Sequence, residues 1–139
     1  MIKTGTPYLY FYDECNDALN YYVDIFGAEI MEKATFEDVA FMEDESRKNC
    51  IAHASFKLGE SVILANEFLE KKRKDNCSAN SQISIWLEIE KDADIKLLEE
   101  KMLATGSKSI IKLEETFWDS LYAKIEDKFG IIWELNAQK

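Results

Sequence analysis

The same order of secondary-structure patterns occurs twice along this 139-residue chain, and this repeat constrains the fold more than any other feature. Residues 8–66 predict a strand, a helix and three strands, and residues 82–136 predict that order again. Each such unit has a sheet face that it cannot bury by itself, so the two units are expected to pair into one core. The sequence therefore predicts an α+β fold of two βαβββ modules, about 6–67 and about 82–136, within one domain, 1–139.

Strand and helix signals are clear in the first half. The run Tyr8–Tyr12 is aromatic and aliphatic, as is typical of a strand. From Asn16 to Phe26 apolar residues recur at three- and four-residue steps, which predicts an amphipathic helix that ends at Gly27. Gly59 predicts a tight turn between the last two of three further strands. These strands are expected over 28–36, 50–58 and 60–66.

The second half begins after a polar segment without periodicity, 67–81, which is the predicted connection between the modules. An alternating pattern over 82–89 predicts a strand, and the apolar stripe from Asp92 to Ala104 predicts a helix that closes at Gly106. Three more strands are expected over 107–113, 121–126 and 131–136.

Charge and hydrophobicity exclude two classes of partner. The formal net charge is −10, and the basic run 71–74 is too short to build a groove for phosphates, so we expect no nucleic-acid binding. No stretch approaches the roughly 20 apolar residues that span a bilayer, so we expect no membrane insertion.

Cysteine usage indicates the compartment. Cys15, Cys50 and Cys77 are odd in number, lie far apart and form no paired motif, so a disulfide framework is not expected. The first residues lack the apolar run of a signal peptide. Both features predict a cytoplasmic protein with reduced thiols, which act as small hydrophobic side chains rather than as nucleophiles.

Several blocks of the sequence carry a family resemblance. They are Thr6–Phe11, Ala18–Ile30, His53–Gly59, Thr116–Tyr122 and Asp127–Asn136. Together they resemble the PhnB-like branch of the glyoxalase, bleomycin-resistance and extradiol-dioxygenase superfamily, also called the vicinal-oxygen-chelate superfamily. The resemblance implies curved mixed sheets that pair around a cup for a small molecule, and it implies a homodimer. The label of ubiquinone methyltransferase sometimes given to this branch finds no support, because no glycine-rich nucleotide loop links a strand to a helix.

Metalloenzymes of this superfamily hold a divalent ion with four side chains, one from the first and one from the last strand of each module. The resemblance places Pro7, Leu64, Ser84 and Glu134 at or next to these positions. The neighbours of Leu64, Ile63 and Ala65, are equally unable to coordinate a metal. Proline and leucine offer no donor atom and serine is a poor neutral ligand, so only Glu134 matches. We therefore expect no metal and no other cofactor.

Other side chains are candidates for contact with a ligand. His53, the single histidine, fits either a catalytic base or a structural residue hydrogen-bonded within the sheet. Strand alternation is expected to place Phe11 with Leu9 and Pro7, Trp86 with Ser84, and Asn136 with Glu134, all facing the cup. Trp86, Phe11 and Trp118 suit either this role or core packing, whereas Trp118 and Tyr122 lie beside a turn where a ligand would touch them.

These residues predict a metal-free small-molecule-binding protein or cofactor-less enzyme of unknown ligand, with a pocket suited to a small, partly aromatic or cationic molecule. Two alternatives stay open. One is a divalent-metal glyoxalase-like or dioxygenase-like enzyme that uses Glu134 and His53. The other is a resistance protein that sequesters an antibiotic between two subunits without turning it over.

Overall fold

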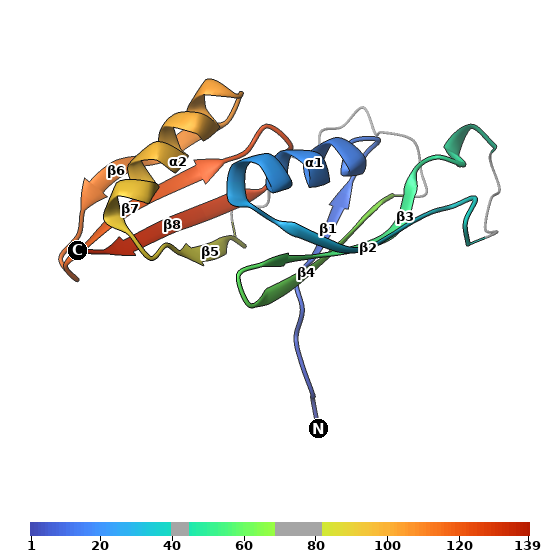
Figure 1. The fold of residues 1–139 in the computed structure, drawn as a ribbon, viewed down its shortest axis with the longest axis horizontal. Helices are drawn as coiled ribbons and strands as arrows, with labels where there is room; N and C mark the ends of the chain where they lie inside the picture. Colours follow the sequence, from blue (N-terminus) through green and yellow to red (C-terminus); the bar gives the residue numbers. More distant parts are fainter. Residues whose placement is uncertain (40–44, 69–81) are drawn as a thin grey trace. The chain divides into compact units, whose positions relative to one another are not determined.

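The computed structural model of the chain describes residues 1–39, 45–68 and 82–139. It divides into two compact units, Met1–Lys74 and Asp75–Lys139, and each contains one long helix and one four-stranded mixed sheet (Figure 1). The predicted α+β class and the repeated βαβββ order are therefore confirmed. That the two units form a single domain around a cup stays a prediction.

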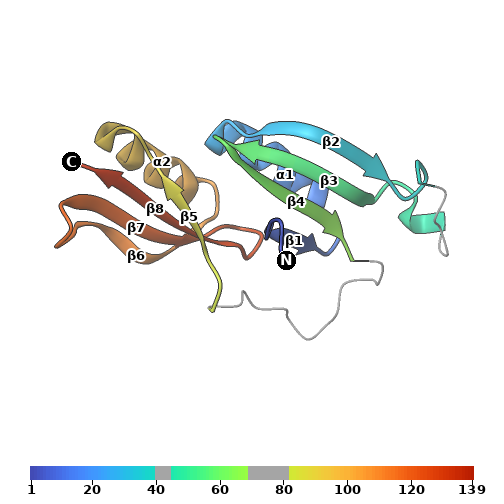
Figure 2. The same ribbon diagram turned by 90° about the horizontal axis from the view of Figure 1, so that it is seen from below.

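Unit 1 follows the predicted order, with one addition. Its elements are β1 (Tyr8–Phe11), α1 (Cys15–Phe26), β2 (Glu29–Thr35), the short 3-10 helix η1 (Glu45–Arg47), β3 (Ile51–Leu58) and β4 (Ser61–Glu67). The strand order is β1-β4-β3-β2, with β1 parallel to β4 and the other pairs antiparallel (Figure 2). Helix η1 is the element that the sequence pattern did not predict.

The core of unit 1 lies between α1 and one face of its sheet. The ring of Tyr22 on α1 stacks on Phe56 of β3, with 5.7 Å between ring centroids, and both side chains are fully buried. Helix α1 ends as predicted at Gly27, whose φ of 69° is left-handed and whose N–H bonds to the carbonyl of Val23. Glycine adopts this conformation without the steric cost that a Cβ would bring.

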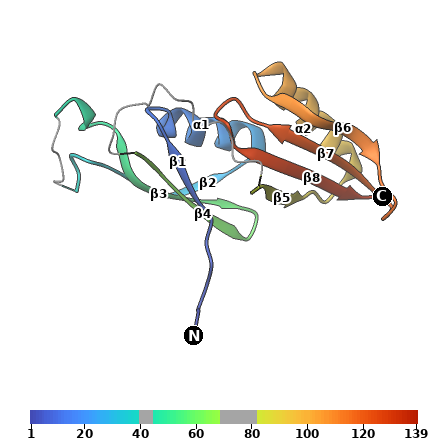
Figure 3. The same cartoon turned by 180° about the vertical axis from the view of Figure 1, so that it is seen from behind.

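Unit 2 repeats the architecture. Its elements are β5 (Ile85–Glu88), α2 (Asp92–Ala104), β6 (Lys108–Glu115), β7 (Ser120–Glu126) and β8 (Ile132–Gln138). The strand order is β5-β8-β7-β6, and β5 is parallel to β8 while the other pairs are antiparallel (Figure 3). Strand β5 is shorter than the predicted 82–89 and β6 extends two residues beyond the predicted 107–113.

Helix α2 covers one face of the unit 2 sheet. Ile95 and Met102 of α2 are fully buried, and so are Trp133 and Leu135, which alternate along β8. Residues between these core positions, such as Glu134, therefore belong to the opposite face. This alternation creates the surface on which the candidate site lies.

The turn that leads into β8 explains the spacing of residues in the block Asp127–Asn136, which carries part of the family resemblance. Both carboxylate oxygens of Asp127 accept hydrogen bonds: Oδ1 from the N–H groups of Phe129 and Ile131, and Oδ2 from the buried indole N–H of Trp133 at 2.8 Å. Gly130 completes the turn with a φ of 92°. The spacing of these residues is thus set by the turn that leads into β8.

Some expectations concern residues outside the described ranges. These are the basic run 71–74, Cys77 and most of the connection 67–81. Cys15 is buried and Cys50 half-buried, and neither forms a disulfide. Burial, with the neighbouring charge of Glu67, raises the pKa of the Cys15 thiol to about 12, so this thiol is not an activated nucleophile. Among the described residues, no helix has the length and apolar character needed to cross a membrane.

Candidate functional site

The unit 2 sheet brings polar and aromatic side chains together on the face opposite α2. In the strand register, Trp86 of β5 is the partner of Glu134 on β8, and Glu88 is the partner of Asn136. On the other side of β8, Tyr122 of β7 pairs with Asn136. We call this surface the Trp–Glu face, and its members are Trp86, Glu88, Trp118, Tyr122, Glu134 and Asn136.

Glu134 is held by two hydroxyl groups. The Ser84 hydroxyl donates to its Oε2, and the Tyr122 hydroxyl donates to its Oε1 at 2.5 Å. Partial burial opposes ionisation of Glu134, but the two hydroxyl bonds and the charge of Lys124 outweigh it, and the pKa lies below the ordinary value. Burial and the bond to this carboxylate raise the pKa of Tyr122. At neutral pH Glu134 is therefore a charged acceptor and Tyr122 a neutral donor.

A second chain of hydrogen bonds fixes the two indoles. Trp86 Nε1 donates to Glu88 Oε2 at 2.7 Å, and Asn136 Nδ2 donates to Glu88 Oε1 at 2.7 Å. Asn136 Oδ1 then accepts from Trp118 Nε1 at 3.0 Å. Because Asn136 is 4% exposed, it is a fixed link that connects one indole to the carboxylate holding the other.

The three rings of the Trp–Glu face form one cluster. The Tyr122 ring lies 5.9 Å from Trp86 and 5.8 Å from Trp118, measured between centroids. Tyr122 is buried, whereas Trp86 and Trp118 are 48% and 42% exposed. Large aromatic side chains normally bury more of their surface than these two indoles do. Two half-exposed indoles that are held by hydrogen bonds to strand residues therefore indicate a surface that binds a partner molecule.

Unit 1 carries a different set on the corresponding sheet face. The hydroxyl of Tyr8 lies 3.4 Å from His53 Nδ1, and the Tyr8 ring stacks on Tyr10 at 4.9 Å. Tyr10 in turn lies 5.0 Å from Phe68. His53 is half-buried on β3 and contacts aromatic side chains. A catalytic role for His53 stays a prediction.

Phe11 differs from the expectation that it faces a ligand cup. It is 3% exposed and alternates with Tyr8 and Tyr10, so it lies on the side of the sheet that α1 covers. Its strand neighbour in the register is Glu67, which bonds to the start of α1. Phe11 is thus a core residue of unit 1, and Leu9, expected on the same side, is buried with it.

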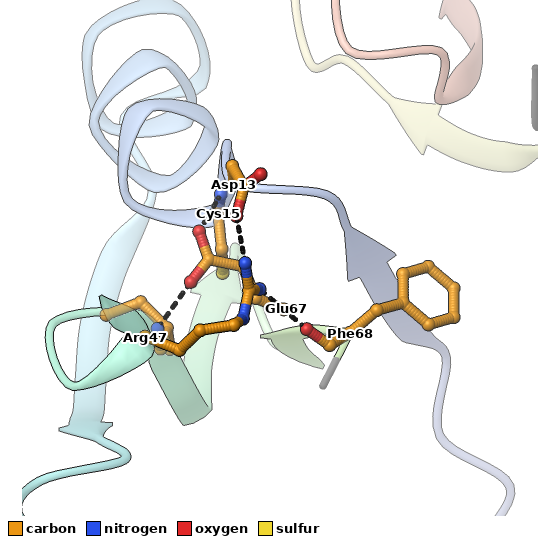
Figure 4. A network of polar contacts seen from close by, with 6 residues as sticks. Asp13, Cys15, Arg47, Glu67 and Phe68 are labelled. Atoms are coloured by element: carbon orange, nitrogen blue, oxygen red, sulfur yellow. Dashed lines mark hydrogen bonds and ion pairs between the residues drawn. The ribbon is translucent and has the colours of Figure 1, made fainter. Parts of the chain in front are cut away.

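The network around Glu67 was not predicted from the sequence (Figure 4). Its Oε1 accepts from the N–H of Cys15 at 3.1 Å and its Oε2 from the N–H of Ile51 at 2.6 Å. Nearby, the guanidinium of Arg47 bonds to Asp13 at 2.5 Å and to the carbonyl of Phe68 at 2.7 Å. The buried carboxylate joins the start of α1 to the start of β3, which is a structural role.

The positions that the resemblance assigns to a metal offer a poor donor set. Pro7 and Leu64 have no donor atom in their side chains, and Ser84 already donates its hydroxyl to Glu134. Within residues 1–39, 45–68 and 82–139, His, Cys, Asp and Glu side chains form no group of three or more that could hold an ion. Of the four positions only Glu134 carries a side chain that commonly binds a divalent ion, and the absence of a metal stays a prediction.

Two members of the network were missed in the sequence, Glu88 as an acceptor and Ser84 as a donor. The signal for Glu88 was present, because it follows Trp86 by two residues and so lies on the same strand face. Trp86, Trp118, Tyr122, Glu134 and Asn136 were all predicted candidates, and the structure brings them into one cluster. Their contact with a ligand stays a prediction.

Comparisons with known proteins agree with this architecture. The family model described as "3-demethylubiquinone-9 3-methyltransferase" matches residues 3–136. Protein YjdN of Escherichia coli K12 is 28% identical over 144 residues, which cover 96% of this chain and 95% of YjdN. Protein PA1353 of Pseudomonas aeruginosa has a similar structure, with a TM-score of 0.80, 24% identity and coverage of 99% and 98% of the two chains. A PhnB protein of Bacillus cereus gives a TM-score of 0.77 at 17% identity, covering 97% of this chain and 99% of its own.

Proposed function

Since the chain belongs to the family described as 3-demethylubiquinone-9 3-methyltransferase, the PhnB-like branch of the vicinal-oxygen-chelate superfamily, we propose that it binds a small organic molecule without a metal. The proposed binding surface is the Trp–Glu face of unit 2. The ligand contacts the half-exposed indoles of Trp86 and Trp118 and the groups fixed between them.

The observation that carries this proposal is the state of Glu134. Each oxygen of this carboxylate accepts a hydroxyl bond, one from Ser84 and one from Tyr122. A divalent ion would gain only this one charged ligand, because Pro7 and Leu64 offer no donor atom and serine is a poor neutral ligand. The same bonds hold Glu134 and Tyr122 in fixed positions, which lowers the entropy cost of binding an organic ligand.

Methyl transfer, which the family's description names, is not part of the proposal. The segments that precede the two helices contain Asp13 and Glu14 before α1 and Lys91 before α2. A glycine-rich nucleotide loop would stand at such a junction. The aromatic and carboxylate groups of unit 2 support the binding of a small molecule. We propose no reaction step for any residue of the Trp–Glu face.

Metal analysis of the tag-free protein tests the proposal. The full chain is incubated with Zn, Ni, Mn and Fe, dialysed extensively and measured by elemental analysis. We expect far less than one metal ion per chain. A near-stoichiometric metal that is lost in Glu134→Gln would refute the metal-free proposal and favour the divalent-metal enzyme.

Ligand screening tests the other half of the proposal. Small molecules that raise the melting temperature of the wild-type chain should fail to do so in the double variant Trp86→Ala, Trp118→Ala. Ligands that stabilise both proteins equally would place binding elsewhere. We also propose a homodimer, because superfamily members commonly pair, and light scattering of the purified chain measures the subunit number directly.

A further inference from the structure

We propose that the molecule held by the Trp–Glu face is an organic cation, in which an alkylated or aromatic ammonium group contacts the half-exposed rings of Trp86 and Trp118. This inference rests on the proposed function and adds the chemical class of the ligand. It depends on three properties of the face: the orientation of its rings, the charge that its hydrogen bonds leave uncompensated, and the position of its cations.

The rings are held by their polar edges. The indole N–H of Trp86 is engaged by Glu88 and that of Trp118 by Asn136, so neither indole needs a ligand acceptor for its N–H. What the half-exposed indoles still offer is apolar and π surface. Tryptophan faces are the best partners for cation–π contacts. A ligand that brings hydrogen-bond acceptors would find these donors already used.

The hydrogen bonds of the two carboxylates on the Trp–Glu face bring no positive charge to them. Every described hydrogen bond to Glu134 and Glu88 comes from a neutral group: the hydroxyls of Ser84 and Tyr122, the indole of Trp86 and the amide of Asn136. In the described part of the chain, neither carboxylate lies in an ion pair with a lysine or arginine. Two fixed negative charges therefore lie beside the aromatic rings, and neither belongs to an ion pair of the described residues.

The nearest cation does not cancel this charge. Lys124 is the register partner of Glu134 on β7, and it is close enough to lower the pKa of that carboxyl. On the neighbouring strand, however, Glu114 is the register partner of Tyr122 and adds a further negative charge beside the rings. The side chains of Glu88, Glu114 and Glu134 together with Lys124 carry a net negative charge. An anionic ligand would be repelled, and a neutral ligand would leave this charge unused.

The three tryptophans of the chain make the test internally controlled. Trp133 is fully buried in the core of unit 2 and donates to Asp127, so its indole N–H resonance reports on the fold and not on the surface. The probes are choline and its neutral isostere, in which carbon replaces the quaternary nitrogen. We expect choline to shift the indole resonances of Trp86 and Trp118 in the NMR spectrum of the full chain, while that of Trp133 stays in place.

The neutral isostere has the same shape and should cause at most weak shifts. Equal shifts with both probes would overturn the inference while leaving the proposed binding surface in place. No shift of Trp86 or Trp118 with either probe would also overturn the inference. The proposed function would then be judged separately by the ligand screen, which does not assume a charge.

A matched pair of variants separates local from overall charge. Glu134→Gln removes one negative charge and keeps a carbonyl acceptor for one of the two hydroxyls, while the other hydroxyl can accept from the new NH₂ group. Glu100→Gln makes the same charge change on the exposed surface of α2. We expect the dissociation constant of choline to rise about tenfold in Glu134→Gln, as for the loss of one partly exposed charge contact. Glu100→Gln should bind like the wild type. Equal weakening in both variants would show that only net charge matters and would overturn the inference.

Discussion

Replacing Glu67 by glutamine should destabilise unit 1 far more than its conservative chemistry suggests. The carboxylate is 4% exposed and accepts two backbone N–H groups, one from Cys15 and one from Ile51 (Figure 4). Glutamine has one carbonyl oxygen and an NH₂ group, so it can accept only one of these two bonds. The other N–H would then face a second donor in a buried site.

The magnitude follows from these contacts. A hydrogen bond to a charged acceptor contributes about 1.5–3 kcal/mol, and a buried donor without a partner costs about 1–3 kcal/mol. Since these two figures describe the same lost bond in part, we expect a loss of about 3 kcal/mol in the free energy of unfolding. With a urea m-value of about 2 kcal/mol/M, the midpoint of unfolding should fall by about 1.5 M.

Urea unfolding followed by circular dichroism measures this shift, and Glu60→Gln is the matched control. Glu60 lies in the exposed turn between β3 and β4 and carries the same charge change. Its midpoint should stay within experimental error of the wild type. If Glu67→Gln unfolds at the same urea concentration as Glu60→Gln, then the buried carboxylate does not hold α1 and β3 as argued, and the reasoning is refuted.

Three further predictions concern single groups. Tyr122→Phe removes one of the two hydroxyl bonds that lower the pKa of Glu134, so an NMR titration of this carboxyl should show its pKa rising toward the ordinary value. Because the folded pKa of Glu134 is lowered, its charge stabilises the fold above about pH 4.3, the ordinary glutamate value, and this contribution is lost as pH falls through the folded pKa. The difference in unfolding free energy between wild type and Glu134→Gln should therefore shrink in acid. Gly27→Ala should cost about 1 kcal/mol, because no atom lies within 4 Å of the added Cβ and only the left-handed φ opposes it; Gly5→Ala is the control without that cost.

The arrangement of elements was largely predictable because it depends on local patterns. The stripe of α1, its stop at Gly27 and the alternation along β8 each follow from short stretches of sequence. Helix η1 was not predictable in this way. Its Arg47 is buried because its guanidinium bonds to Asp13 and Phe68, which lie 34 and 21 residues away. No local pattern carries such information.

In the candidate site, too, only the features that depend on a local sequence pattern were predictable. Trp86, Glu134 and Asn136 could be grouped because strand residues two apart share a face. Phe11 was assigned to the other face because Tyr8–Tyr12 is apolar at every position and so gives no alternation to follow. The face of β1 is fixed by its pairing with β4, in which Tyr8 is the partner of Leu64. A one-residue change in that register reverses every side chain of the strand.

The internal repeat allows the two units to be compared position by position. In unit 2, Trp86 of β5 pairs with Glu134 of β8, and in unit 1, Tyr8 of β1 pairs with Leu64 of β4. The family resemblance places Leu64 in the last strand of unit 1 at the position that Glu134 has in unit 2, and the two units have the same strand order. An apolar side chain thus stands where the second module has its carboxylate. The negative charge at this position is therefore present in unit 2 and absent from unit 1, and it does not follow from the fold that both units share.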